Sequence, residues 1–183
     1  YTLSVSKNAV LNFNKLIQRR VKNEPIAYIF NKKEFWSKNF LVNNNTLIPR
    51  PETEILVEKI IHYFRDKEIS ILDIGTGSGC ILLTLLDQIK KSRGWGLDIS
   101  KKAIQVAIKN SKKFKKNNRL KFVNRSLENI FGYKFDLIVS NPPYISTHQL
   151  KNLSQDIKGY EPRIALDGGN DGLDVIKKVI YKS

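Results

Sequence analysis

The residues best suited to chemistry in this sequence begin with a glycine-rich segment, Asp73–Gly79, of the pattern G-x-G-x-G. Glycine lets the backbone approach a ligand closely and adopt conformations that are closed to other residues. The spacing differs from the G-x-G-x-x-G of dinucleotide-binding loops, and no Lys-Ser or Lys-Thr pair follows, which excludes a P-loop. A tight turn without a ligand is the alternative. We predict that a ligand contacts Gly75, Thr76, Gly77, Ser78 and Gly79.

A second candidate is Asp98, which lies 19 residues beyond Gly79 at the end of an apolar run. An acidic residue at about this distance is placed to accept hydrogen bonds from the two hydroxyls of a ribose. Asp98 can also cap the next helix beside Ser100, and the two roles are compatible. Together, the glycine-rich segment and Asp98 predict a nucleoside-bearing cofactor, and NAD and S-adenosylmethionine both satisfy that pattern.

The third candidate is the tetrapeptide Asn141-Pro142-Pro143-Tyr144, which directly follows another apolar run. Two prolines restrict the backbone, and Pro143 has no N–H to donate. The side-chain oxygen of Asn141 and the carbonyl of Pro142 are therefore available as acceptors for the two N–H groups of a planar –NH2. Tyr144 can lie against the flat face of such a group. The tetrapeptide predicts a site that orients an amide or amino nitrogen toward an electrophilic methyl group, although the same residues can form a plain turn.

The elements that must position these residues alternate between strands and helices from Ile69 onward. Four short apolar runs predict strands at residues 71–74, 95–98, 120–123 and 135–139. Helical spacing between the first three of them predicts helices at residues 81–89 and 101–116. Another helix is predicted over 174–181. Continuous apolar strands alternating with helices indicate an α/β fold, a doubly wound and mostly parallel sheet covered on both faces.

The residues before this pattern predict smaller elements. Apolar residues recur at helical spacing up to Val21, so we assign residues 1–23 to the tail of a helical domain or to a linker. Residues 24–48 predict a β-hairpin, and residues 49–183 the main domain. A helix opens near Pro51, with an apolar face formed by Leu56, Ile60, Tyr63 and Phe64. The chain has no methionine, and we expect it to be cut at both ends.

Composition excludes some classes of protein and leaves one question open. The 183 residues are 41% hydrophobic and 27% charged, which argues against a disordered chain, and they contain no apolar run long enough to span a bilayer. The one cysteine, Cys80, indicates a reducing compartment and hence the cytoplasm. The net charge of +15 is compatible with a nucleic-acid partner. However, 24 lysines against eight arginines, with 17 asparagines and 22 isoleucines, favour AT-rich coding as its cause.

The three motifs together resemble the class I methyltransferases that use S-adenosylmethionine to modify nitrogen. Further segments are similar to the peptide chain release factor glutamine methyltransferases, the PrmC/HemK type. These segments are Glu24–Tyr28, Glu34–Ser37, Leu47–Glu54, Glu161–Gly169 and Gly172-Leu173. The resemblance covers essentially the whole chain. It implies a Rossmann-like domain, S-adenosylmethionine as cofactor, and transfer of methyl to the N5 nitrogen of the glutamine in the Gly-Gly-Gln motif of release factors.

The resemblance also implies roles for individual residues. Gly75 to Gly79 would contact the methionine part of the cofactor, Asp98 its ribose and Leu127 its adenine ring. Ser126 stands where the family often has an aspartate that contacts the adenine. Catalysis would fall to Asn141, Pro142 and Tyr144, and substrate binding to the same residues together with Pro143. Asn141 would also contact the cofactor. Phe35, Trp36 and the segment 50–54 would wall the site or would belong to the core.

Two alternative substrates remain within the same chemistry, a ribosomal-protein glutamine and a nucleic-acid adenine. The segment Leu47–Glu54 favours the release-factor type, whereas only the basic charge supports nucleic acid. A module that binds the cofactor without catalysis is a third alternative, and the intact Asn141 to Tyr144 tetrapeptide argues against it. We expect no metal site, because His62 and His148 lack ligand partners at useful spacing. We expect no membrane partner.

Overall fold

A four-stranded sheet forms the centre of the computed structural model, which describes residues 5–115, 117–130 and 132–182. The strand order is β5-β4-β3-β6, and every neighbouring pair is parallel. The strands are β3 (Ser70–Ile74), β4 (Arg93–Asp98), β5 (Leu120–Asn124) and β6 (Leu137–Ser140). Parallel strands end at one common edge of a sheet, so the residues after β3, β4 and β6 are brought together there.

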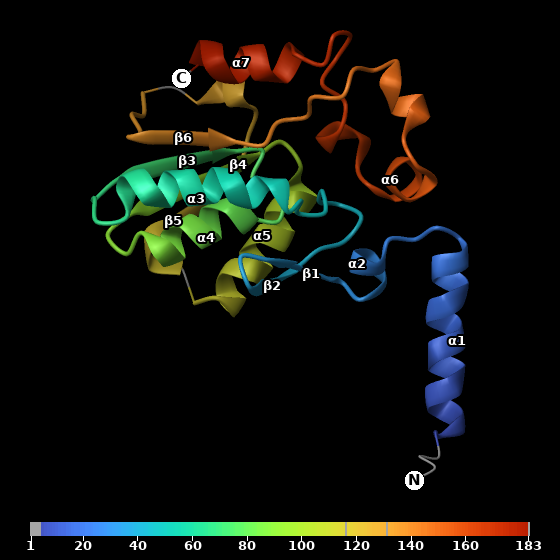
Figure 1. Cartoon of the computed structure of the whole chain (residues 1–183). Coiled ribbons are helices and arrows are strands. Elements are labelled where there is room, and N and C mark those ends of the chain that lie inside the picture. Colours follow the sequence, from blue (N-terminus) through green and yellow to red (C-terminus); the bar gives the residue numbers. More distant parts are fainter. Residues whose placement is uncertain (1–4, 116, 131, 183) are drawn as a thin grey trace.

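Helices cover both faces of this sheet. On one face lie α3 (Glu52–Phe64), α4 (Cys80–Gln88) and α5 (Lys101–Lys113), and on the other lies α7 (Asp174–Lys182) (Figure 1). Alternate residues of β3 separate the two cores: Ile71 packs with α3 and α4, whereas Leu72 packs in a cluster that includes Val179 of α7. The predicted doubly wound, mostly parallel α/β class is confirmed.

A small hairpin packs beside the sheet through its phenylalanines. Strands β1 (Lys32–Phe35) and β2 (Lys38–Leu41) are antiparallel, and Phe35 and Phe40 are buried in the main core. Phe40 also meets Phe114 at the end of α5, with ring centroids 4.9 Å apart. Of the range 24–48 predicted as a hairpin, residues 32–41 form it, and Ile26–Ile29 form the short helix α2.

The first helix, α1 (Lys7–Val21), extends away from the rest of the molecule (Figure 1). None of its residues is buried. Its C-terminal end is tied to α2, because Arg19 pairs with Glu24 and donates to the carbonyl of Ile29. The helix occurs where the apolar spacing predicts it, and the domain boundaries at residues 23 and 48 stay predictions.

Two helices differ in detail from the sequence prediction. In α3, Tyr63 is 65% exposed, whereas Val57 and Ile61 are buried. Ile60 is buried and Leu56 and Phe64 pack against the core, as predicted, so the buried face differs from the prediction at Tyr63. Helix α5 ends at Lys113 rather than at Lys116, since Phe114 caps it and Lys115 has a φ of 54°. Lys116 itself lies outside the described residues.

The chain after β6 folds back over the carboxyl edge of the sheet in short elements. These are η3 (Gln149–Asn152), α6 (Gln155–Tyr160) and η4 (Arg163–Ala165). Earlier in the chain, the short turns η1 (Asn117–Arg119) and η2 (Leu127–Asn129) flank β5. Ile145 donates to the carbonyl of Leu166 at 3.1 Å, and Gly168 donates to the carbonyl of Ile145 at 2.8 Å. These bonds hold residues 161–169 beside the Asn141 to Tyr144 tetrapeptide.

Candidate active site

The glycine-rich segment forms a loop between β3 and α4, as the sequence predicts. Its glycines Gly75, Gly77 and Gly79 have φ values of 71°, 55° and 80°, in the left-handed region that glycine adopts most readily. A Cβ atom built on Gly75 meets no protein atom within 4 Å, so that position opens onto free space. The loop therefore offers bare backbone to a ligand.

Asp98 at the end of β4 supports this loop. One oxygen of its carboxylate accepts the N–H of Gly77 at 2.9 Å, and the other accepts the N–H of Ser100 at 2.8 Å. Burial raises the pKa of Asp98, while these two N–H groups lower it. Asp98 also lines the large cavity described below, and its oxygens can accept further hydrogen bonds from ligand hydroxyls.

Two titratable groups lie beneath the loop. Asp73 is fully buried, and burial raises its pKa to about 7, although the hydroxyl of Thr76, which donates to it at 2.7 Å, acts in the opposite direction. Burial likewise raises the pKa of Cys80 to about 12. Cys80 is therefore a thiol at neutral pH and acts as a packing residue rather than a nucleophile.

The loop and Asp98 border a cavity of about 920 Å³. All but one of the residues that we predicted to bind the cofactor line this cavity: Gly75, Thr76, Gly77, Ser78, Asp98, Leu127 and Asn141. The exception is Gly79. Gly79 is the N-cap of α4, and a Cβ on it would lie 3.1 Å from a methyl carbon of Leu83. We expect Gly79 to shape the loop from within the fold.

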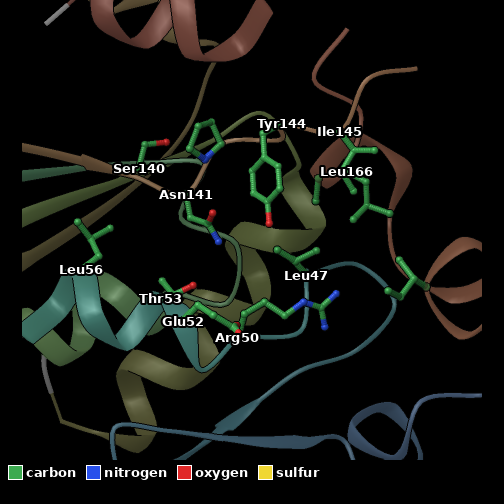
Figure 2. A pocket seen from close by; sticks show the side chains of 13 residues that line it. Leu47, Arg50, Glu52, Thr53, Leu56, Ser140, Asn141, Tyr144, Ile145 and Leu166 are labelled. Atoms are coloured by element: carbon green, nitrogen blue, oxygen red, sulfur yellow. The ribbon is translucent and has the colours of Figure 1, made fainter. Parts of the chain in front are cut away.

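The Asn141 to Tyr144 tetrapeptide leaves the end of β6 next to the glycine loop. The hydroxyl of Ser140 donates to the carbonyl of Ile74 at 2.7 Å, so the residue before Asn141 is tied to the residue before Gly75. Asn141, Pro142 and Tyr144 line a smaller cavity of about 420 Å³. In Figure 2 the amide of Asn141 and the ring of Tyr144 point into the same space.

The two cavities meet at a small set of residues. Asn141 lines both of them, whereas Pro142 faces the smaller cavity and Pro143 the larger one. The other shared residues are Leu47, Thr53 and Ala165. A group held by Asn141 in the smaller cavity would therefore adjoin a ligand in the larger one.

An ion pair joins two walls of the smaller cavity. The carboxylate of Glu161, whose side chain is 1% exposed, accepts from Arg50 at 2.5 Å and from the N–H of Ile48 at 3.1 Å. Arg50 lines the cavity, as do Glu52 and Thr53 from the same predicted wall. Phe35 and Trp36, the other residues that could have walled the site, pack instead in the main core.

Several residues that line the larger cavity belong to none of the motifs predicted from the sequence. Ile99, Arg125 and Glu128 line it, together with residues 45–47 and 162–165. Ser126 also lines it, and its hydroxyl bonds to the carboxylate of Glu128 at 2.9 Å. A carboxylate thus lies two residues beyond Ser126 at this wall of the cavity. In the sequence, only the position of Glu128 next to Leu127 indicates that its carboxylate faces this cavity.

Residues 5–115, 117–130 and 132–182 contain neither a metal-binding cluster of side chains nor a membrane-spanning helix. No group of three or more His, Cys, Asp or Glu side chains there could hold a metal ion. No helix in those ranges has the length and apolar character needed to cross a membrane.

Comparison with known sequences places the chain in a family. Residues 51–158 match the family described as Methyltransferase small domain. The chain belongs to this family. A release factor glutamine methyltransferase from Buchnera aphidicola subsp. Baizongia pistaciae is 41% identical over 182 residues, which cover 99% of this chain and 65% of the relative. Its counterpart from Buchnera aphidicola subsp. Schizaphis graminum is 44% identical over 181 residues, with the same coverage.

These matches confirm the resemblance to release factor glutamine methyltransferases. The chain spans 65% of the length of each of these two relatives. Among solved structures, the hMettl16 catalytic domain in complex with MAT2A 3'UTR hairpin 6 is similar over 93% of this chain and 73% of its own, with a TM-score of 0.60 and 15% identity. At that identity the likeness concerns the fold alone.

Proposed function

We propose that this protein transfers a methyl group from S-adenosylmethionine to the N5 amide nitrogen of a glutamine in translation release factors, within their Gly-Gly-Gln motif. The observation that carries the proposal is the junction of the two cavities at Asn141, the side chain suited to hold an amide. The names of the two Buchnera relatives support the same reaction and the same substrate.

The larger cavity fits S-adenosylmethionine by its chemistry. Its volume of about 920 Å³ lies within the usual range for pockets that hold small molecules and cofactors. The bare backbone around Gly75 leaves room for a ligand, and the carboxylate of Asp98 can accept hydrogen bonds from ribose hydroxyls. Ile99 and Leu127 offer apolar contact to a flat base. When bound, the cofactor supplies an electrophilic methyl group.

Residues of the smaller cavity would hold the glutamine. An amide nitrogen is a weak nucleophile because its lone pair is delocalised into the carbonyl. Hydrogen bonds from its N–H groups to the side-chain oxygen of Asn141 and the carbonyl of Pro142 would fix its orientation. These bonds should strengthen as positive charge develops on nitrogen, which lowers the barrier to transfer. Placement of the nitrogen at the cavity junction supplies the proximity that the reaction needs.

The walls of the smaller cavity would exclude water from this nitrogen. Leu47, Leu56 and Leu166 contribute apolar side chains, and Tyr144 contributes its ring (Figure 2). Tyr144 is 63% exposed, so a bound peptide would be needed to cover it. We expect a release factor to be the partner that covers the site. Because release factors act in translation, we expect the reaction to take place in the cytoplasm.

Transfer of a labelled methyl group tests the proposal. The full-length gene product would be given labelled S-adenosylmethionine with a release factor, the same factor lacking the Gly-Gly-Gln glutamine, a ribosomal-protein substrate, or DNA or RNA. We expect label on the intact release factor and on none of the others. Label on nucleic acid or on the ribosomal protein alone would overturn the assigned substrate. Cofactor binding with no transfer to any of them would overturn the catalytic assignment.

A further inference from the structure

Asn110 of α5 is a buried polar side chain that neither cavity contains. It is 0% exposed, and a buried amide is stable only when its polar atoms are paired. Its oxygen accepts the N–H of Leu41 at 2.7 Å. Its nitrogen donates to the carbonyl of Leu41 at 3.0 Å and to the carbonyl of Ser78 at 2.9 Å. Both donors and one acceptor site of the amide are therefore used.

These bonds join two segments that are far apart in the sequence. Leu41 is the last residue of β2, and Ser78 belongs to the glycine loop. A short distance after Leu41, residues 45–47 line the larger cavity, and Leu47 also lines the smaller one. One side chain thus contacts the backbone that leads to both sides of the candidate active site.

The bond to Ser78 also fixes the shape of the glycine loop from outside the cavity. The carbonyl of Ser78 and the N–H of Gly79 belong to one planar peptide unit and point in opposite directions. The carbonyl accepts from Asn110, while that N–H donates to the carbonyl of Thr76 at 2.7 Å. This peptide unit is held at both ends, so the unusual dihedral angles of the loop do not depend on a ligand to maintain them.

We propose that Asn110 is a positioning residue that couples the glycine loop to the hairpin, so that the cofactor cavity and the wall it shares with the substrate cavity keep one geometry. The readouts that use cofactor and substrate rest on the proposed function above. Asn110 touches neither ligand, and it acts through the backbone of Ser78 and Leu41.

The chain offers matched variants for a test. Asn110→Asp keeps the size and the acceptor for the N–H of Leu41 but replaces the nitrogen that donates to the carbonyls of Ser78 and Leu41 with an oxygen. Lys113→Ala breaks another bond between α5 and the hairpin, from the Lys113 ammonium to the carbonyl of Asn39, without touching the loop. Val106→Ala removes buried apolar volume from α5 at a side chain that lines neither cavity.

The full-length gene product would be measured by calorimetric titration with S-adenosylmethionine and by steady-state kinetics with the release factor. We expect Asn110→Asp to weaken cofactor binding by about tenfold and to raise the KM for the release factor as well, because both hydrogen bonds that the amide nitrogen donates are lost. Val106→Ala and Lys113→Ala should keep both constants even where their melting temperatures fall. A lower melting temperature for Asn110→Asp with both constants unchanged would overturn the proposal.

Amide hydrogen exchange separates this proposal from the proposed function. Without any ligand, Asn110→Asp should increase exchange both in the glycine loop, residues 75–79, and in residues 42–47, whereas Lys113→Ala should affect the hairpin side alone. Loss of protection on one side only in Asn110→Asp would contradict the coupling. If the wild type does not bind S-adenosylmethionine, the proposed function fails, and this exchange pattern still decides the coupling.

The wild type provides a measurement that does not depend on the stability of a variant. The N–H of Leu41 bonds to Asn110 and lies outside both cavities. Saturation with S-adenosylhomocysteine, a non-reactive relative of the cofactor, should slow exchange of this amide if the loop and the hairpin are coupled. Binding of that probe with unchanged exchange at Leu41 would overturn the proposal.

Discussion

The two cavities of the candidate active site are built in different ways. The larger one centres on the ends of β3 and β4, where backbone groups of the glycine loop and the carboxylate of Asp98 face the ligand space. The smaller one collects side chains from three separate segments, residues 47–56, 140–145 and 157–166. The glycine loop and Asp98 at the centre of the larger cavity come from local motifs, although residues 45–47, 125–128 and 162–165 complete its lining. The smaller cavity has no such local centre and exists only because distant segments meet.

The two cavities are therefore sensitive to different kinds of substitution. A cavity bordered by bare backbone is damaged by adding atoms or by changing dihedral angles. A cavity assembled from distant side chains is damaged by removing the side chains that hold its walls together. The Arg50–Glu161 pair is such a connection, since it joins residues 111 positions apart.

The largest effect should come from the junction of the cavities. Asn141→Ala removes the acceptor for the substrate amide, and we expect kcat to fall by about 10²- to 10³-fold with little change in cofactor affinity. Steady-state kinetics and calorimetric titration measure the two quantities. Asn152→Ala, an exposed asparagine on η3, is the control and should behave as the wild type. Normal turnover by the Asn141 variant would refute its role.

The next effect sharpens the description of the smaller cavity. Glu161→Gln removes the charge that pairs with Arg50, and we expect a loss of about 2 kcal/mol in the free energy of unfolding, because the carboxylate is buried. The KM for the release factor should rise while cofactor affinity stays constant. Glu68→Gln breaks the exposed pair with Arg93 and should cost less than about 1 kcal/mol. Equal losses in urea unfolding would contradict this contrast.

A smaller effect tests the bare backbone of the larger cavity. Gly75 and Gly132 have φ values of 71° and 75°, and a Cβ on either meets no atom within 4 Å. Gly75→Ala and Gly132→Ala therefore share the same backbone strain, but only Gly75 lines the cavity. We expect Gly75→Ala to weaken cofactor binding by about tenfold, or 1.4 kcal/mol, whereas Gly132→Ala should leave it unchanged. The same affinity in both variants would mean that no ligand approaches Gly75.

The smallest effect concerns the carboxyl beneath the glycine loop. The pKa of Asp73 is raised to about 7 in the folded state, above its ordinary value of 3.8. The folded state therefore retains a proton that the unfolded state has released, and the contribution of Asp73 to stability falls as the pH rises through about 4 to 7. Between pH 6 and 8 we expect a loss of about 1 kcal/mol in the free energy of unfolding.

Urea unfolding at several pH values measures this loss, and Asp73→Asn is the comparison because it cannot ionise. The difference in stability between the wild type and the variant should change over this range in favour of the variant. A constant difference from pH 6 to 8 would show that Asp73 does not titrate there.

The centre of the larger cavity could be predicted from the sequence, because the glycine loop is one continuous segment and Asp98 ends the next strand. A strand, a glycine-rich turn and a helix in succession place Gly75 to Ser78 at a sheet edge, and β4 places Asp98 beside them. Glu128 and Ile99 were not predicted, because no motif includes them, although each adjoins a residue that we predicted to bind the cofactor. The need for glycine at position 96 could not be predicted either. A Cβ there would lie 2.6 Å from the ring of Phe122, a contact that only strand pairing creates.

The smaller cavity could not be derived in the same way. Asn141 and Tyr144 were identified by residue type, and the resemblance suggested that residues 50–54 lie near them. The sequence is compatible with Phe35 and Trp36 either in the wall or in the core. In the structure Phe35 is buried in the core, and Trp36 packs partly buried against it. The link from Glu161 to Arg50 depends on the path of residues 145–169 back across the sheet edge, which no local pattern specifies.

The sequence by itself determined the order of strands and helices, the glycine loop, Asp98 and the Asn141 to Tyr144 tetrapeptide, because apolar periodicity and backbone chemistry act over a few residues. The tertiary structure decided that the two cavities share Asn141, that Glu161 holds Arg50 and that Asn110 joins the hairpin to the glycine loop. Those contacts arise only when the parallel sheet aligns its carboxyl ends, because burial of the apolar faces as a whole fixes which distant segments meet.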